Sequence, residues 1–156
     1  MNRAALIDRL ADHIAGVRSH PLGVAGFMIE DEIAAGRAVM QPGSVWPFDF
    51  PAADWVFPTV VSHDGREVHI VAILAQNPGS GAFRRLIANI EAAGLSPVVV
   101  CPVGVVMPAI LKHWRWKRRI VGRGFDRVDE WRPPAKRSAR SPSAASAGNL
   151  PPDDPK

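Results

Sequence analysis

The segment with the clearest chemical potential is residues 76–81, Gln-Asn-Pro-Gly-Ser-Gly, which follow a predicted strand and precede a predicted helix. A helix N-terminus presents unpaired backbone N–H groups and partial positive charge, and glycines let an anion approach them closely. The segment lacks the Gly-Lys-Ser/Thr of triphosphate-binding loops and the three-glycine spacing of dinucleotide-binding loops. It therefore predicts a pyrophosphate cradle. The alternative is a plain strand-to-helix turn in which Ser80 caps the helix.

Two titratable side chains, Glu67 and His69, lie two residues apart on the predicted strand that leads into this loop. Residues at this spacing share one face of a strand, and the ordinary pKa of histidine suits a general base near neutral pH. Both are candidate catalytic bases. The alternative is that both are solvated strand residues.

Other reactive residue types give weaker signals. Nothing in the sequence places three metal ligands together, so no metal site is expected. The single cysteine, Cys101, follows a run of valines and is predicted to be a small buried apolar residue rather than a nucleophile. The aromatic residues between positions 46 and 57 either line an acceptor pocket or pack in the core.

The elements that must position these residues follow from hydrophobic periodicity and from turn residues. Predicted helices cover 3–18, capped by Asn2, then 29–35, 81–93 and a segment that begins near Pro108. Predicted strands cover 38–41, 56–62, 67–75, 97–103, 119–121 and 128–131, with Asp64-Gly65 as a hairpin turn. This order predicts an α/β (α+β) fold with a mixed central sheet flanked by helices.

The folded domain is predicted to span residues 1–132. Residues 133–156 are rich in Pro, Ser and Ala and contain Leu150 as their only large aliphatic residue. Such a segment cannot bury enough apolar area to offset its ordering entropy, so it is predicted to be a disordered basic tail.

The loop matches the pattern Gln/Arg-x-x-Gly-x-Gly/Ala through Gln76, Gly79 and Gly81. Together with the element order over residues 1–125, this resembles the GNAT superfamily of N-acyltransferases, in which the motif follows the fourth strand and binds the pyrophosphate of acetyl-CoA. The segment 113–118, His-Trp-Arg-Trp-Lys-Arg, also resembles that family's helix-to-strand passage, with Trp116 at the position of an aromatic residue.

The resemblance implies an acyl-CoA-dependent N-acyltransferase, with acetyl-CoA or another acyl-CoA as co-substrate and an amine acceptor that is a small molecule or a macromolecule. The amine would attack directly, with Glu67 or His69 as base. The implied cofactor-binding residues are Leu74 or Ala75, whose backbone would polarise the thioester, Gln76, Gly79, Ser80 and Gly81 at the pyrophosphate, and Lys117 near the 3′-phosphate.

The chain departs from the family pattern at three places. It contains no Tyr, so the general acid common in the fourth helix has no counterpart at the aligned position, near Leu111. Arg115 stands where the family has Gly before the aromatic residue, and Pro78 shortens the loop.

The charge distribution supports a second hypothesis. From Lys112 to Arg140 there are 11 basic and 3 acidic residues, a local charge of 11 − 3 = +8, whereas the whole chain carries +4. Basic residues interleaved with tryptophan are typical of nucleic-acid contacts. The alternative function is therefore nucleic-acid binding, or a catalytically degenerate GNAT-like interaction protein that uses this region.

Location follows from the same sequence. One cysteine fits a reducing compartment. No apolar run approaches the roughly 20 residues needed to span a bilayer, and residues 1–8 do not have the apolar stretch of a signal peptide. The protein is predicted to be cytoplasmic and free of membrane contact, and its oligomeric state is left open.

Overall fold

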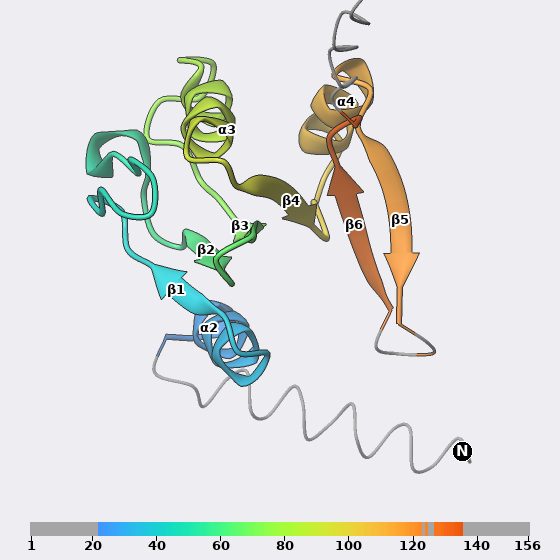
Figure 1. Cartoon of the computed structure of the whole chain (residues 1–156), viewed down its shortest axis with the longest axis horizontal. Coiled ribbons are helices and arrows are strands. Elements are labelled where there is room, and N and C mark those ends of the chain that lie inside the picture. Colours follow the sequence, from blue (N-terminus) through green and yellow to red (C-terminus); the bar gives the residue numbers. More distant parts are fainter. Residues whose placement is uncertain (1–21, 123, 125–126, 136–156) are drawn as a thin grey trace, which may run out of the picture.

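The computed structural model describes residues 22–122, 124 and 127–135, which form an α+β fold with one mixed, open, six-stranded sheet (Figure 1). The helix predicted at 3–18 and the tail beyond residue 135 lie outside these residues. The helices of the described part are α2 Val24–Ala34, α3 Ala82–Ala92 and α4 Val106–His113, with one 3₁₀ turn, η1 Ala52–Asp54. The strands are β1 Ala38–Met40, β2 Val60–His63, β3 Glu67–Ala72, β4 Ser96–Val100, β5 Lys117–Val121 and β6 Val128–Arg132.

The strand order is β1-β2-β3-β4-β6-β5, and the β3–β4 pair is parallel whereas all the others are antiparallel. The predicted hairpin at Asp64-Gly65 is confirmed: the Asp64 carboxylate accepts hydrogen bonds of 2.8 Å from the backbone N–H groups of Arg66 and Glu67. The predicted central position of β3 is also confirmed, since β3 lies between β2 and β4.

Helices cover opposite faces of the sheet. Val61 joins the apolar core that also contains Leu86 and Ile90 of α3. Its neighbour Ser62 points to the other face, where its hydroxyl bonds Glu32 of α2. Successive strand residues face opposite sides, so α3 and α2 pack on the two sides of the sheet, as Figure 1 shows. The main core therefore lies between the sheet and α3.

Several element boundaries differ from the sequence prediction; among them, β3 ends at Ala72 and not at 75, and β5 begins at Lys117 and not at 119. Helix α2 begins at Val24, not at 29, so Glu30, Asp31 and Glu32 lie in its later turns and not at its positive end. Strand β2 begins only after Pro58, whose nitrogen cannot donate to a ladder.

Strand β4 ends at Val100, and the next residue, Cys101, has φ 45° and is exposed, so its predicted burial is wrong. A left-handed residue followed by Pro102 cannot continue a regular strand. Val103, predicted as the end of a buried strand, is 88% exposed.

All three helices end in the same hydrogen-bond pattern. In α3 the N–H of Gly94 bonds Glu91 O and the N–H of Leu95 bonds Ile90 O, with Gly94 at φ 77°. Gly36 holds the equivalent left-handed position after α2, and both terminations were predicted from the sequence. This is the Schellman arrangement, in which the left-handed residue is usually glycine.

After α4 the left-handed residue is Arg115, at φ 61°. The N–H of Arg115 bonds Lys112 O and the N–H of Trp116 bonds Leu111 O, each at 2.9 Å. The Cβ of a non-glycine residue clashes in this conformation and costs roughly 1–2 kcal/mol. A glycine would avoid this penalty, whereas Arg115 carries it.

We predict that Arg115→Gly raises the free energy of unfolding by about 1 kcal/mol, because it removes this penalty. Chemical denaturation of the two proteins measures the difference. Gly94→Ala, the opposite change at the same helix-terminal position, is the matched control and should lower the free energy of unfolding by about 1 kcal/mol. A less stable Arg115→Gly variant would contradict the assignment.

Candidate functional site

The site is built where strands β3 and β4 separate. They pair from Glu67–Ser96 to Ile70–Val99, and no pairing between them continues beyond this point within the described residues. On the other side of β3, Val61 pairs with Ile70 but Val60 pairs with Ala72, so Val71 is the extra residue of a β-bulge. A bulge bends its strand and increases the local twist. It therefore turns the end of β3 away from β4.

An apolar cavity of about 420 Å³ fills the space between the separated strands. Residues 70–74 form one wall and residues 99–103 the other. Met28 of α2, Pro58 and Met107 of α4 complete the lining. Cys101 lies in this wall, and its Sγ accepts a 3.5 Å contact from the backbone N–H of Asp129.

A second hollow, of about 540 Å³, adjoins this cavity at the predicted anion loop. Leu74 lines the cavity, and the next residue, Ala75, lines the hollow. The cavity and the hollow therefore meet at consecutive residues of the chain. Residues 79–84 provide the floor, and Trp114 stacks on Phe83 with ring centroids 5.3 Å apart and planes inclined by 7°. The guanidinium of Arg84 lies 5.8 Å from the Trp114 ring. The hollow thus combines a helix N-terminus, a flat aromatic wall and a cation.

The backbone amides of this loop are largely unpaired. Helix α3 begins after Gly81, which has φ 81° and provides no side-chain cap, so the alternative in which Ser80 caps the helix is wrong. Of the three loop amides predicted to hold an anion, that of Ser80 is occupied, since it donates to Asn77 O at 3.2 Å. Within the described part of the chain, the N–H groups of Gly79, Gly81 and residues 82–84 make no hydrogen bond.

One further amide faces the gap between the strands. The bonds from Val56 N–H to Leu74 O and from Gln76 N–H to Asp54 O flank an isolated bridge between Trp55 and Ala75. In such an antiparallel pair the two bridged residues direct their own N–H and C=O groups outward. The Ala75 amide therefore points away from Trp55, and it has no hydrogen-bond partner among the described residues.

Arg85 fixes the loop. Its guanidinium donates to the carboxylate of Asp54 at 2.8 and 3.2 Å and to the Ser80 carbonyl at 2.8 Å. The hydrogen bonds that Arg85 donates to the Asp54 carboxylate are the main reason why the pKa of Arg85 is raised. The guanidinium of Arg85 donates to the carboxylate of Asp54 and to a loop carbonyl. It therefore orders the loop without occupying the loop N–H groups.

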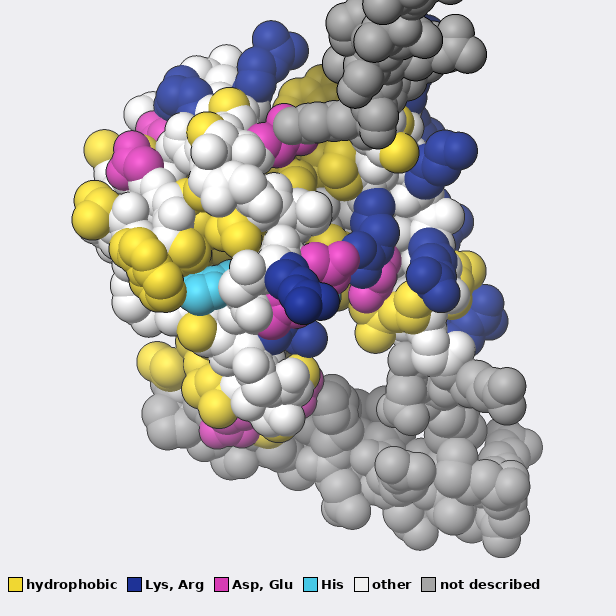
Figure 2. Space-filling model, viewed as in Figure 1, with side chains coloured by type: hydrophobic (Ala, Val, Ile, Leu, Met, Phe, Trp, Pro, Cys, Tyr) yellow, Lys and Arg dark blue, Asp and Glu magenta, His cyan; other side chains and the backbone are white. Residues whose placement is uncertain are grey.

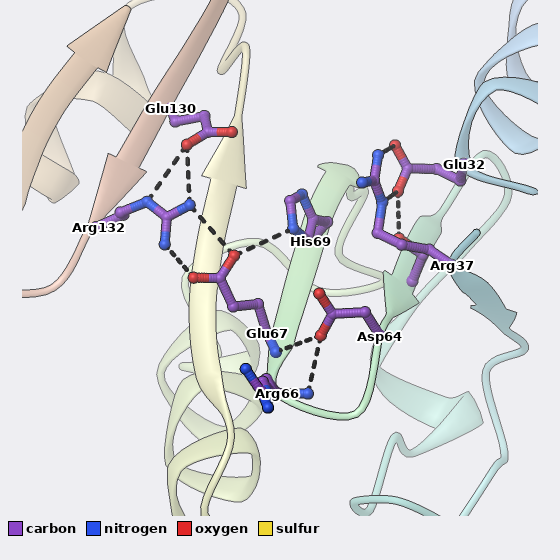
Figure 3. A network of polar contacts seen from close by, with 9 residues as sticks. Glu32, Arg37, Asp64, Arg66, Glu67, His69, Glu130 and Arg132 are labelled. Carbon is purple, nitrogen blue, oxygen red and sulfur yellow. Dashed lines mark hydrogen bonds and ion pairs between the residues drawn. The ribbon is translucent and has the colours of Figure 1, made fainter. Parts of the chain in front are cut away.

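The two predicted catalytic bases lie together, as expected; His69 is buried, whereas the Glu67 side chain is 31% exposed (Figure 3). His69 is 8% exposed, and its Nε2 lies 3.5 Å from Oε2 of Glu67. Both carboxylate oxygens of Glu67 bond the guanidinium of Arg132, which also bonds Glu130 at 3.0 Å. These bonds from Arg132 hold the pKa of Glu67 below its ordinary value. A carboxylate that is bound in this way is a weak base.

A second charged group lies on the same face, toward α2 (Figure 3). Glu32 is 5% exposed and accepts bonds from the Arg37 guanidinium and the Ser62 hydroxyl. Burial acts to raise the pKa of Glu32, but those two hydrogen bonds outweigh it and the pKa is lowered. Glu32 is thus a buried anion that ties α2 to the sheet.

The structure does not bring all the predicted site residues together. Ala75, Gly79, Ser80 and Gly81 line the hollow, and Leu74 lines the apolar cavity. Gln76 is exposed, and its N–H serves the bridge to η1. Glu67 and His69 lie at the paired end of β3. Lys117 does not line the hollow: it lies exposed at the start of β5, opposite Arg132 and on the far edge of the sheet.

Sequence reasoning missed Arg84, Arg85 and Phe83 as parts of the site. Their positions at the start of the predicted helix 81–93 were visible in the sequence. Phe83 and Trp114 are 31 positions apart in the sequence. Their stacking depends on how α3 and the end of α4 are placed, which no local pattern reveals. The partner of Glu67, 65 positions away, has no sequence signal either.

Comparisons with protein-family models, with curated proteins and with solved structures find no match to this chain. Among the described residues no helix is long and apolar enough to cross a membrane. The same part of the chain holds no group of three His, Cys, Asp or Glu residues arranged for a metal ion. Any functional assignment therefore depends on the geometry of the two adjoining cavities.

We predict that Glu67→Gln lowers the free energy of unfolding near neutral pH and has a smaller effect in acid. The folded-state pKa of Glu67 is depressed, so its stabilising contribution is fully present above its unfolded value of 4.5 and is lost as the pH falls through the folded value. Urea denaturation at pH 7 and at pH 3.5 measures the change.

The same substitution in an Arg132→Met background is the control. Without the guanidinium, Glu67→Gln should have little effect at pH 7, because the interaction that lowers the pKa is gone. A stability difference that does not change with pH would contradict the ion pair.

Proposed function

We propose that this chain is an acyl-CoA-dependent N-acyltransferase that transfers an acyl group to an amine by direct attack. The observation that carries the proposal is the pair of adjoining cavities: an open hollow with unpaired backbone amides at the start of α3, next to an apolar cleft opened by the bulge at Val71. Coenzyme A carries a diphosphate, an extended arm and a thioester in this order. The order of the element types, α2 through β6, agrees with the resemblance to the GNAT superfamily.

The diphosphate would bind the amides of Gly79, Gly81 and the first turn of α3. Gly79, Gly81 and Arg84 are exposed residues, these amides make no hydrogen bond within the described part of the chain, and the helix dipole adds positive potential there. Arg84, exposed at the rim, adds a full positive charge. Ser80 would contribute its hydroxyl and not its amide, which the loop itself uses.

The extended arm would pass along the end of β3 into the cleft. The Ala75 amide has no internal partner and faces the gap, so it is a suitable donor to the thioester carbonyl, where negative charge develops during attack. The amine nitrogen forms a bond to the carbonyl carbon, the C–S bond breaks, and the coenzyme A thiolate takes up a proton. The attacking nitrogen must lose a proton to a base.

His69 suits this base better than Glu67. His69 is two residues from Val71, which lines the cleft. Glu67 is one step further away, and Arg132 occupies both of its oxygens. In this arrangement Glu67 is a positioning residue that holds His69 through the 3.5 Å contact.

We predict that acetyl-CoA and free coenzyme A bind the protein in calorimetric titration with micromolar affinity, and that Ser80→Glu weakens this binding at least tenfold. The new carboxylate would repel the diphosphate. Ser80 is exposed and its hydroxyl makes no hydrogen bond within the described structure, so the fold should be unaffected.

Ala92→Glu is the matched control, since it adds the same charge to an exposed position at the other end of α3. It should leave the affinity unchanged. Absence of binding to the unmodified protein, or equal weakening by both variants, would overturn the proposal.

A second candidate function, nucleic-acid binding, is favoured by one observation. Strand β5 is the free edge of the sheet and begins Lys117-Arg118-Arg119, all exposed, with Lys112 and Arg115 exposed just before it. Figure 2 shows dark blue side chains along the side of the molecule where β5 and β6 lie in Figure 1. Of these cations, Arg118 is paired with Asp129 at 2.7 Å. Charged residues on an edge strand also protect it from pairing with other chains.

If this surface binds nucleic acid, the affinity for a single-stranded oligonucleotide should fall steeply with salt, by roughly 10²-fold or more between 50 and 200 mM for several phosphate contacts. Lys117→Gln combined with Arg119→Gln should reduce the slope. Fluorescence anisotropy measures both. A flat salt response would leave β5 as a solvated, aggregation-resistant edge.

A further inference from the structure

We infer that the acyl group is a medium-length hydrocarbon chain of about six to ten carbons and not acetyl. The inference rests on the proposed function and concerns what the cleft between β3 and β4 accepts beyond the thioester. The features that carry it are the composition of the cleft lining, its volume and the apolar side chains at its rim.

The lining is apolar throughout. Of the thirteen described residues that line the cavity, none is charged, and Cys101 is the only one whose side chain is not a hydrocarbon or a thioether. A site that accepted a polar or charged acyl group would have to offer it hydrogen-bond partners, because burial of an unpaired polar group is costly. This lining instead favours a ligand that is hydrocarbon at its inner end.

The volume exceeds what acetyl needs. An acyl carbon occupies about as much space as a water molecule, for which roughly 30 Å³ is typical, so acetyl fills about 60 Å³. The cavity holds about 420 Å³. After the thioester end of the coenzyme arm has entered, room remains for several further methylene groups. An apolar cavity that stays empty loses packing contacts along its walls.

Two features of the walls suit a flexible chain. Met28 and Met107 lie in the lining and come from helices α2 and α4. Methionine is unbranched and adaptable, and it fills irregular gaps around flexible ligands. At the rim, Leu74 is 48% exposed and Val103 is 88% exposed. Apolar side chains so exposed beside a cavity are typical of a binding site for an apolar ligand.

The test compares coenzyme A, acetyl-CoA and octanoyl-CoA as calorimetric ligands of the full chain. Burial of each methylene increases affinity roughly two- to fourfold. Octanoyl-CoA should therefore bind at least tenfold more tightly than acetyl-CoA, and acetyl-CoA should bind little more tightly than coenzyme A.

Val71→Phe and, separately, Val100→Phe should fill the cavity and remove most of the difference in affinity between octanoyl-CoA and acetyl-CoA. The two variants are on opposite walls, and chemical denaturation reports whether each is folded. Val105→Phe is the matched control, since it makes the same change at an 83% exposed residue outside the lining. It should leave all three affinities unchanged.

The outcomes separate the two levels of the proposal. Equal affinities for acetyl-CoA and octanoyl-CoA would overturn the inference on chain length and leave the proposed function in place. An octanoyl advantage that survives both filling variants, or that is lost in Val105→Phe as well, would place the chain elsewhere on the surface and also overturn it. If none of the three ligands binds, the proposed function itself fails.

Discussion

The structure depends on the point at which β3 and β4 stop pairing. Parallel pairing satisfies the backbone groups of both strands as far as Ile70 and Val99, and the extra residue Val71 then bends β3 out of the ladder. Beyond that point the two strands must find other partners. The end of β3 finds one on its β2 side, at the Trp55–Ala75 bridge, and is left open on the other. The cleft, its apolar lining and the free Ala75 amide all follow from this single divergence.

The paired end of β3 has the opposite character. There Arg132 of β6 reaches past β4 to hold Glu67 of β3, and it also contacts Glu130 of its own strand. These groups are only partly exposed, so salt screens their attraction less than that of a fully exposed ion pair. Removal of one partner would leave the remaining charges unpaired. The network fixes β3, β4 and β6 relative to one another at this end of the sheet, whereas β3 and β4 separate at the other end.

The sequence predicted those features that local chemistry determines. Gly36 and Gly94 end their helices because the left-handed position favours glycine, and Asp64 forms the hairpin because its carboxylate reaches two nearby amides. The mixed α+β character and the central position of β3 also followed from periodicity. The sequence did not reveal the bulge at Val71, since one additional β-branched residue in an apolar strand leaves no mark on the pattern. The sequence also predicted the wrong exposure for Cys101. A run of valines predicts burial, whereas the left-handed backbone at Cys101 ends the strand and leaves the residue exposed.

The site residues divide in the same way. Gly79, Ser80 and Gly81 line the hollow because a strand-loop-helix connection is local, and Lys117 lies outside its lining because its position depends on how β5 is ordered in the sheet. Which amides of the loop are free was likewise not readable, because the turn that occupies Ser80 depends on the actual backbone path.

The uncapped start of α3 shows how the fold retains unpaired donors. With Gly81 at the N-cap position, lack of a side-chain cap costs the helix roughly a few tenths of a kcal/mol. Leu86 and Ile90 of α3 are buried to within 1% of full burial, and each contributes roughly 1.5–3 kcal/mol through removal of apolar surface from water. Packing of the apolar face therefore holds the helix in place without a cap, and the N–H groups of Gly79 and Gly81 keep no hydrogen-bond partner among the described residues. An additional cap would stabilise the helix but would occupy its N–H donors. The buried apolar face stabilises α3, and its N-terminal turn keeps the unpaired N–H groups.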